Sequence, residues 1–443
     1  MGIKLMALGG YNEVGRNMTA LDIDGEIIIL DIGLYIPAVI EYEEVQDKLT
    51  NEEMLKIKAI PDDTLLRERR HDVKAIVIGH SHLDHIGGVP YMANTYAHAP
   101  IIGTPFTIRL LEKILKDKNR KVKNEKIILK IGEKIKIGEN IIIEFINITH
   151  STVDCALVVV HTNYGDVVYS LDFKFDNHPV LGNKPNYEKI KSLTNVKALI
   201  LDSLYAKDDI KTPSEKVAKE MLKDVLLGTN NQGRAIIITT FSSHLARLKT
   251  FIELGQKLGR KVVFLGRSLN RYVKAAEEVG IIKFSNQVEI VAYANKIKKK
   301  LKQIMKEGSY KYIIVCTGNQ AEPGSVLTKM ANGKLHFNFN YEDQVIFSCR
   351  TIPVEENIKN REKLENKLKG LGCRIFKNLH VSGHASKEDD RDLIDMLKPE
   401  MIVPAHGGRN ITSAGAQLAQ EMEYVLGKNV FILKDGETVD IVA

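Results

Sequence analysis

Cysteine is scarce in this sequence, and the four cysteines follow no pattern. Cys155, Cys316, Cys349 and Cys373 lie far apart, mostly within apolar runs, and none belongs to a Cys-x-x-Cys motif. This spacing excludes a disulfide framework and a cysteine zinc site. We expect four buried, reduced thiols, as is typical of a cytosolic protein.

Long apolar runs, repeats and low-complexity tracts are also missing. No stretch is apolar for long enough to span a membrane, and the segment before Gly9-Gly10 is too short for a signal peptide. With 44% hydrophobic and 27% charged residues, the composition is that of a soluble globular protein, which we expect to be cytoplasmic. The 63 Lys and Arg residues exceed the 56 Asp and Glu residues, a mild excess that permits a polyanionic partner without requiring one.

One short segment carries four side chains that commonly bind metals. The β-branched run 73–79 predicts a buried strand, and His80, His82, Asp84 and His85 follow directly. Residues two apart in extended backbone point to the same side, so His80 and His82 share one face. Imidazole and carboxylate ligands suit zinc, and four in six positions exceed what one open catalytic ion takes from the protein. The segment therefore predicts two metal ions.

The same arrangement recurs along the chain, where apolar runs end in His or Asp. In layered α/β proteins, the carboxyl ends of strands form the rim on which sites are built. A single histidine at a strand end is usually structural, but five ends with ligand-type residues predict one convergent site. These strand ends are at His80, His150, Asp172, Asp202 and His406.

The first third of the sequence predicts strands with few helices. Residues 19–23 and 26–30 flank Asp24-Gly25, a strong hairpin signal. Thr104 and Pro105 predict the start of a helix, and strands are expected at 141–146 and 167–171. Residues 37–71 are charged and weakly periodic, and we assign them no role.

From residue 206 to 374 the pattern changes to alternating strands and helices, which is typical of a parallel sheet. Strands are expected at 235–240, 261–265, 312–316 and 344–349, and helices near 243–258, 268–279 and 295–306. A capping box at 212–215 is expected to open a further helix that ends at Gly228. This block is therefore predicted to be a domain inserted into the first one, to which the chain returns with residues 375–443.

These motifs carry a family resemblance. The His80–His85 segment with His150, Asp172 and His406 resembles the metallo-β-lactamase superfamily, and the inserted block resembles its β-CASP branch. Within that branch the sequence is most similar to the ribonuclease J family in its shorter archaeal form, which stretches 9–17, 241–244, 317–325 and 382–386 support. The resemblance implies an αββα sandwich (1–205 and 375–443) with an inserted β-CASP domain (206–374). No segment matching the extra C-terminal domain of bacterial relatives follows residue 443, so oligomer geometry that depends on it is not carried over.

The resemblance also implies roles for these residues. His80, His82 and His150 would hold one zinc ion, and Asp84, His85 and His406 the other, with Asp172 bridging the two. Asp31 would orient the ligands. Asp202 and His384 would form an acid pair that protonates the leaving oxygen or stabilises charge on the phosphate. His406 at the last metal motif favours RNA over DNA.

The expected activity is 5′→3′ degradation of single-stranded RNA with a preference for a 5′ monophosphate, by a protein that we expect to be a homodimer. Glycine, serine and histidine groups would bind the terminal phosphate. These residues are Ser243, His244, Ser382, Gly383, Ala385 and Ser386. Taken singly, each of these loops is equally well explained as an ordinary turn.

Other functions remain open at this point. An RNA endonuclease of the same branch would use the same ligands. A small-molecule hydrolase such as a thioester hydrolase would not need an insertion as large as 206–374. A non-catalytic RNA-binding scaffold is disfavoured because all seven metal-ligand positions are filled. Basic runs at 116–126 and 296–302 are by default solvated faces.

Overall fold

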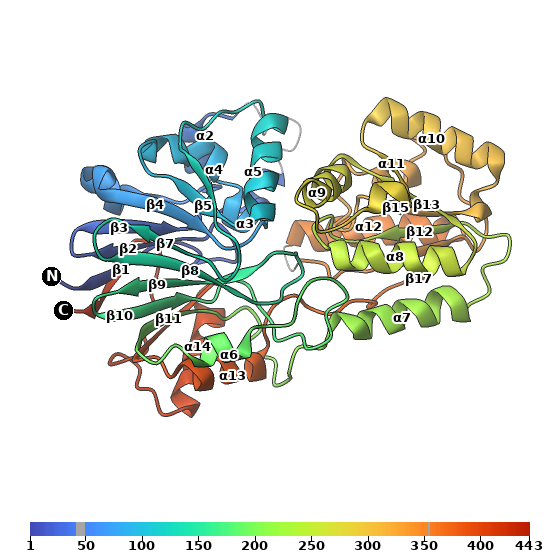
Figure 1. Cartoon of the computed structure of the whole chain (residues 1–443). Helices are drawn as coiled ribbons and strands as arrows, with labels where there is room; N and C mark the ends of the chain where they lie inside the picture. The colour runs from blue at the N-terminus through green and yellow to red at the C-terminus, as the bar shows by residue number, and fades with distance from the viewer. Residues whose placement is uncertain (41–48, 353–354) are drawn as a thin grey trace. The chain divides into compact units, whose positions relative to one another are not determined.

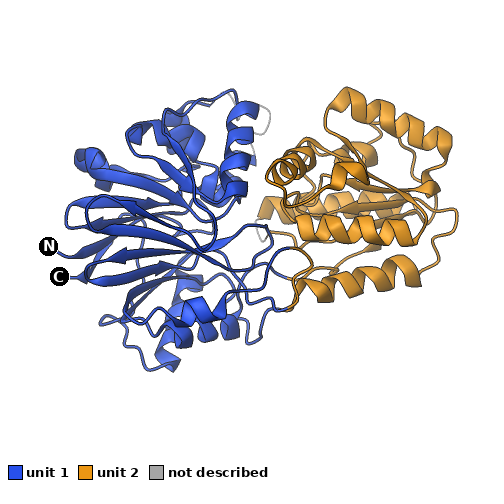
Figure 2. Cartoon of the chain, viewed as in Figure 1, with its two compact units in different colours: residues 1–177, 182–212, 382–443 blue, residues 178–181, 213–381 orange. Residues whose placement is uncertain are grey.

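The chain folds into two compact units. The computed structural model describes residues 1–40, 49–352 and 355–443. Unit 1 contains residues 1–177, 182–212 and 382–443, and unit 2 contains residues 178–181 and 213–381 (Figure 2). The sequence placed the limits of the insertion at 206 and 374. Thr212 stays with unit 1 because its hydroxyl donates to the carbonyl of His384 at 2.8 Å and its amide donates to Asp389 at 2.7 Å.

Unit 1 is built on two β-sheets (Figure 1). The first has the order β19-β1-β2-β3-β4-β5-β6 and the second β18-β11-β10-β9-β8-β7. The strands of the first sheet are β1 (Ile3–Gly9), β2 (Met18–Ile23), β3 (Glu26–Leu30), β4 (Val73–Ile78), β5 (Ile101–Gly103), β6 (Lys126–Ile128) and β19 (Thr438–Val442). Those of the second are β7 (Lys134–Ile137), β8 (Ile141–Asn147), β9 (Ala156–Thr162), β10 (Gly165–Tyr169), β11 (Val196–Asp202) and β18 (Met401–Ala405).

The main core of unit 1 lies between these two sheets. Alternate apolar residues of β1 to β4 pack there against alternate residues of β8 to β11, as the two-residue period of strands requires. A second cluster lies on the other face of the second sheet, beneath α6 (Tyr187–Lys191), α13 (Lys387–Leu397) and α14 (Arg409–Glu421). Helix α5 (Pro105–Asp117) packs against β5 and β6 of the first sheet. This order of layers is the αββα sandwich that the sequence predicted.

The remaining helices of unit 1 are short. They are α1 (Ile36–Ile40), α2 (Asn51–Lys56), η2 (Thr64–Asp72), α3 (Leu83–Ile86), α4 (Val89–Met92) and η3 (Ala93–Tyr96). Helices α1, α2 and η2 overlap the segment 37–71, for which no role was predicted. Residues 41–48 of that segment lie outside the described residues.

Unit 2 contains a six-stranded sheet in which every pair is parallel, in the order β14-β13-β15-β12-β16-β17. Its strands are β12 (Ile236–Thr239), β13 (Lys261–Leu265), β14 (Glu289–Val291), β15 (Tyr312–Cys316), β16 (Gln344–Phe347) and β17 (Arg374–Phe376). Its helices are α7 (Glu215–Gly228), α8 (Leu245–Lys257), α9 (Arg267–Glu278), α10 (Ala294–Glu307), α11 (Val326–Ala331) and α12 (Glu355–Gly370), with η4 (Phe284–Asn286) and η5 (Ser309–Lys311). Helices α10, α11 and α12 bury one face of the sheet. The parallel sheet predicted for the insertion is confirmed.

Local signals in the sequence were mostly accurate, with two corrections. The hairpin around Asp24-Gly25 forms, and Thr104 caps α5. The strand expected at 167–171 ends at Tyr169, because Leu171 has a φ of +54° and leaves the extended conformation. The N-cap of α7 is Ser214, which accepts from the Lys216 amide, so the capping box expected from Thr212 does not form.

The cysteines and the helices agree with two features of the sequence, the lack of cysteine motifs and the lack of long apolar runs. All four cysteines are buried and free. Within the described residues, the helices are too short or too polar to cross a membrane.

Candidate metal centre

Five strand ends in unit 1 deliver the candidate metal ligands to one place. His80 follows β4, Asp172 follows β10 and His406 follows β18, while Asp202 is the last residue of β11. His150 lies just beyond β8, where Thr149 bridges to Lys174. His82 is the N-cap of α3, so Asp84 and His85 lie in its first turn. The convergence that the sequence predicted is therefore present.

Asp172 belongs to a candidate group with Asp202, His384 and His406, and it is also shared by two groups made only of the predicted ligands. Within each group the candidate atoms all lie within 4.8 Å of one another. One group contains His80, His82, His150 and Asp172, and the other contains Asp84, His85, His406 and Asp172. The Asp172 carboxylate lies between them, with Oδ2 at 3.4 Å from His80 Nε2 and Oδ1 at 3.2 Å from His85 Nε2. The family resemblance implied two ligand sets of the same composition, and their roles as zinc ligands stay a prediction.

Several of these atoms are buried without any hydrogen-bond partner among the described residues. They are both ring nitrogens of His80, both carboxylate oxygens of Asp172 and Nε2 of His406. Buried polar atoms of this kind are costly unless they are hydrogen-bonded or bind a metal. In the same cluster, Nε2 of His150 lies 3.0 Å from Nδ1 of His82. The donors therefore fit a pair of metal cations, and their nitrogen and carboxylate chemistry suits zinc.

The protonation of the cluster also suits metal binding. Burial, and then the neighbouring imidazoles, lower the pKa of His80 and of His82 to about 3. The same causes lower the pKa of His150 well below its ordinary value. Burial opposes ionisation of Asp172, but the surrounding imidazoles hold its pKa well below the usual range. Neutral imidazoles beside an ionised carboxylate are the ligand forms that bind zinc. Burial lowers the pKa of His85, but the carboxylates around it raise that pKa well above its ordinary value, so this ring must lose a proton when a metal binds.

Asp202 and His384 form a hydrogen-bonded pair beside this cluster. Nδ1 of His384 donates to Oδ2 of Asp202 at 2.8 Å, and Nε2 of His384 lies 3.8 Å from Asp172. Burial alone would lower the pKa of His384, but the carboxylates of Asp172 and Asp202 raise it to about 9. The raised pKa favours the protonated ring, as a hydrogen-bond donor or acid requires.

Comparison with known proteins assigns the family. Family models match residues 57–223 (beta-lactamase superfamily domain), 232–367 (ribonuclease J, beta-CASP domain) and 371–433 (Zn-dependent metallo-hydrolase RNA specificity domain). Ribonuclease J of Methanocaldococcus jannaschii is 46% identical over 99% of this chain and 98% of its own length. The chain belongs to the ribonuclease J family. Ribonuclease J of Pyrococcus abyssi is 44% identical, over 99% of this chain and 97% of its own.

More distant relatives extend this assignment. Ribonuclease J2 of Bacillus subtilis is 31% identical over 99% of this chain and 75% of its own length. The crystal structure of a protein of unknown function from Enterococcus faecalis V583 superposes over all of both chains with a TM-score of 0.66. At 17% identity that likeness concerns the fold alone. Family membership and the two ligand groups together support a metal cofactor.

A second layer of side chains orients the ligands in this ribonuclease J family member. Nδ1 of His85 donates to Oδ2 of Asp31 at 2.6 Å, so Asp31 has the contact expected of a residue that orients a ligand. The φ of Asp31 is +64°, an uncommon value for a residue other than glycine.

Asn17 also contacts two of the candidate ligands, and no role was predicted for it from the sequence. Its Nδ2 atom lies 3.1 Å from Nε2 of His85, and its Oδ1 accepts from Nδ1 of His406 at 3.1 Å. One amide thus connects two ligands that are 321 residues apart in the sequence, since they lie 68 and 389 residues from Asn17. Gly10 makes room for it, because a Cβ at Gly10 would lie 2.3 Å from Oδ1 of Asn17. The glycine-rich stretch 9–17 was the only available signal.

The loop 382–386 lies beside His150 and ends at α13. Nδ1 of His150 donates to the Gly383 carbonyl at 2.7 Å, and a Cβ at Gly383 would lie 2.6 Å from that of Ser151. The hydroxyl of Ser382 accepts from the His384 amide at 3.0 Å. Ala385 and Ser386 are buried, and the Ser386 hydroxyl both caps α13 and bonds to Thr212. Ser386 therefore shapes this loop and is not exposed to a ligand.

The other two predicted phosphate ligands, Ser243 and His244, lie in unit 2. Both are buried there, and Nε2 of His244 is 3.3 Å from the carboxylate of Glu215. Their role in phosphate binding stays a prediction.

Proposed function

We propose that this chain degrades single-stranded RNA from the 5′ end with two zinc ions per chain, and that it prefers a 5′ monophosphate. Membership of the ribonuclease J family assigns RNA as the substrate and hydrolysis of phosphodiester bonds as the reaction. One observation carries the proposal: two ligand groups share Asp172 at a strand-end rim that also holds the Asp202–His384 pair.

The ligand assignment follows the two groups in unit 1. His80, His82 and His150 would hold one zinc ion, Asp84, His85 and His406 the other, and the Asp172 carboxylate both. Zinc ions bound there would supply positive charge beside the scissile phosphate and acidify a water molecule to give the nucleophile. Asp31 and Asn17 fix the rings of His85 and His406, so that their remaining nitrogens face the centre.

His384 provides the proton or hydrogen bond that the reaction needs. Its Nδ1 proton is held by Asp202, which leaves Nε2–H to be donated toward the centre. The raised pKa of His384 favours the charged ring, which can stabilise developing negative charge on the phosphate or protonate the leaving 3′ oxygen. Asp202 is itself fixed, since its Oδ1 accepts from the Leu204 amide at 3.0 Å.

Recognition of the 5′ end is the most specific part of the proposal. A terminus differs from the chain interior by its end phosphate, so an exonuclease must bind that group. The Ser382 hydroxyl and the backbone of Gly383 lie beside His150 and His384 and would serve as phosphate ligands. A closed pocket for one phosphate would exclude the bulkier triphosphate.

A time course on RNA of defined ends tests the function. Linear RNA with a labelled 5′ monophosphate should release labelled mononucleotide from the earliest time points, and 5′-triphosphate RNA should react more slowly. A circular RNA of the same sequence should be cut slowly if at all. Equal rates on circular and linear RNA would identify an endonuclease instead and remove the 5′-end proposal.

Assays with further substrates distinguish the proposed ribonuclease from two other functions. Hydrolysis of a thioester without cleavage of RNA would identify a small-molecule hydrolase, and RNA binding without cleavage a scaffold. The homodimer and the cytoplasmic location rest on the sequence alone and stay predictions, to be checked by light scattering and cell fractionation.

A further inference from the structure

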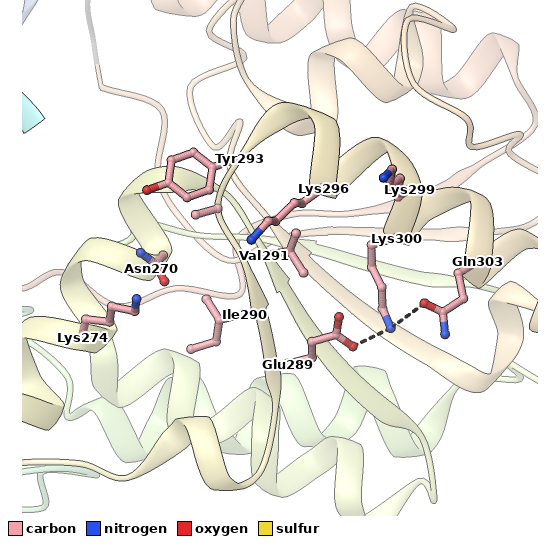
Figure 3. Close-up of a pocket in the computed structure, with 11 residues that line it drawn as sticks. Asn270, Lys274, Glu289, Ile290, Val291, Tyr293, Lys296, Lys299, Lys300 and Gln303 are labelled. Atoms are coloured by element: carbon pink, nitrogen blue, oxygen red, sulfur yellow. Dashed lines mark hydrogen bonds and ion pairs between the residues drawn. The ribbon is translucent and has the colours of Figure 1, made fainter.

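Unit 2 contains a basic pocket that the metal centre does not use. It has a volume of about 380 Å³ and lies along the edge strand β14, between α9 and α10 (Figure 3). Four lysines and one glutamate line it, which gives the pocket a net charge of +3. These residues are Lys274, Lys296, Lys299, Lys300 and Glu289. A cavity of this size is large enough for a small ligand or one nucleotide of a longer chain.

The helical period explains why lysines gather on this side of α10. Lys296, Lys299, Lys300 and Gln303 are spaced three, four and seven residues apart, so they share one face of the helix. Lys298, Lys302 and Lys306 lie outside the pocket lining on the same helix and are exposed. The basic run 296–302, by default a solvated face, therefore contains lysines that line the pocket and lysines that do not.

Most of the positive charge in the pocket is uncompensated. Nζ of Lys300 contacts the Glu289 carboxylate at 2.5 Å and the Gln303 side chain at 3.4 Å, and the Lys300 side chain is only 8% exposed. Among the described residues, Lys274, Lys296 and Lys299 form no ion pair with a carboxylate. Unpaired lysines around one concave site attract anions, and phosphate is the anion that lysine ammonium groups commonly bind.

An aromatic ring at the rim adds a second kind of contact. Tyr293 precedes α10 and is 62% exposed. Figure 3 shows its ring at the edge of the lysine-lined space, on the side where Lys274 and Lys296 lie. An exposed tyrosine beside unpaired lysines is the combination that binds single-stranded nucleic acid, with a base on the ring and phosphates on the ammonium groups.

We propose that this pocket of unit 2 is an RNA-binding site separate from the metal centre, in which Tyr293 stacks on a base and Lys274, Lys296 and Lys299 bind the adjoining phosphates. The proposal rests on RNA being the substrate and adds a second point of attachment for the strand. Such a site raises affinity for longer RNA without taking part in hydrolysis. It is expected to change KM and to leave kcat unchanged.

Binding measurements on the full chain test this proposal. The probe is a 3′-fluorescent, unstructured 30-nucleotide RNA with a 5′ monophosphate, bound by protein carrying His384→Ala to limit cleavage. Replacing Lys274, Lys296 and Lys299 with Gln should weaken binding and lower the slope of log K against log salt by about 2, at roughly 0.7 per phosphate contact. Tyr293→Ala should weaken binding by roughly tenfold, and Tyr293→Phe should not.

The chain supplies matched controls. Replacing Lys298, Lys302 and Lys306 with Gln removes the same charge from exposed positions of α10 that do not line the pocket, and it should change neither affinity nor salt slope. Tyr341→Ala removes a tyrosine that is 72% exposed elsewhere in unit 2. Equal losses from both lysine sets, or no loss from the pocket set, would overturn the proposal.

Two further measurements distinguish this RNA-binding site from a catalytic role and from a mononucleotide-binding site. With His384 intact, the pocket variants should raise KM for the 30-nucleotide RNA and keep kcat within about twofold of the parent; a fall in kcat alone would overturn the assignment. Displacement of the RNA by free 5′-AMP, lost in the pocket variants, would make this a mononucleotide site and also overturn it. If the parent protein binds RNA but does not cleave it, the proposed function fails while the binding result still decides the pocket.

Discussion

His384 is assigned to proton or hydrogen-bond donation and the ligand candidates to zinc binding, so single substitutions should affect zinc content and turnover differently. His384→Ala removes the donor held by Asp202 and leaves the seven predicted ligands in place, so zinc content should be unchanged while turnover falls by roughly 10²–10⁴. His82→Ala or Asp84→Ala should lose zinc and activity together. Metal analysis and RNA turnover on the same preparations check both; loss of zinc in His384→Ala would make His384 a ligand.

Asn17 gives a second residue-scale prediction, because it contacts a ring of each of two ligands. Asn17→Ala leaves all seven ligands in place but frees the ring of His406, whose Nδ1 donates to Asn17, so zinc affinity should fall by about 10–100-fold. Competition with a chelating dye measures that affinity. Asn12→Ala, an exposed position on the same loop, is the control and should bind zinc as the parent does. Unchanged affinity in Asn17→Ala would show that the rings are held without it.

At the scale of helices and strands, the sequence predicts those features that a short run of neighbouring residues determines. A β-branched run that ends in ligand-type residues identifies both a strand and its end, so His80, His150, Asp172, Asp202 and His406 were all located. Asn17 was given no role because its partners are 68 and 389 residues away and an asparagine in a glycine-rich loop has no chemical signature. β14 and β17 have three residues each, too few to show a period, and α12 has polar residues on most sides.

A cross-strand cluster in the second sheet of unit 1 makes stability depend on pH. His161 of β9 hydrogen-bonds Asp166 of β10 at 2.7 Å and Glu144 of β8 at 2.9 Å. The hydrogen bond to Asp166 raises the pKa of His161 above its ordinary value of 6.5, against the effect of burial. A raised pKa stabilises the folded state fully below pH 6.5, and that contribution is lost as the pH rises through the folded-state value.

His161→Gln should therefore destabilise unit 1 at pH 6 and have a smaller effect at pH 9, with a difference of about 1 kcal/mol at most for partly exposed ion pairs. Urea unfolding of parent and variant at several pH values measures this. His71→Gln, at a side chain that is 78% exposed, is the control. A destabilisation that does not vary with pH would mean that His161 contributes packing and not charge.

At the scale of the whole molecule, one buried arginine connects both ends of the inserted unit. Arg247 is fully buried, and its guanidinium forms two bonds to Glu215, near the start of the insertion, with Nη2 to Oε2 at 2.7 Å. Its Nη1 donates at 3.1 Å to the carbonyl of Leu379, near the end. Burial opposes ionisation of Glu215, but His244 and Arg247 hold its pKa well below the usual range. Arg247 therefore connects the segment where the chain enters unit 2 to the segment where the chain leaves it.

Breaking this connection should destabilise unit 2 specifically. Arg247→Met removes the buried ion pair of Glu215, which keeps only His244 beside it, and one of the two donors to the Leu379 carbonyl, so unfolding of residues 213–381 should cost about 3–5 kcal/mol less than in the parent. Arg234→Met removes an ion pair with Glu342 whose side chains are 36% and 42% exposed, and it should cost less than about 1 kcal/mol. Hydrogen exchange read by peptide, together with zinc content, locates the effect: protection should fall in unit 2 while the zinc of unit 1 is retained. The double variant Glu215→Met with Arg247→Met should be more stable than Arg247→Met alone, because it leaves no buried carboxylate without its arginine. If it is not, or if Arg247→Met destabilises unit 2 no more than Arg234→Met does, the ends of the insertion are held by packing and not by this ion pair.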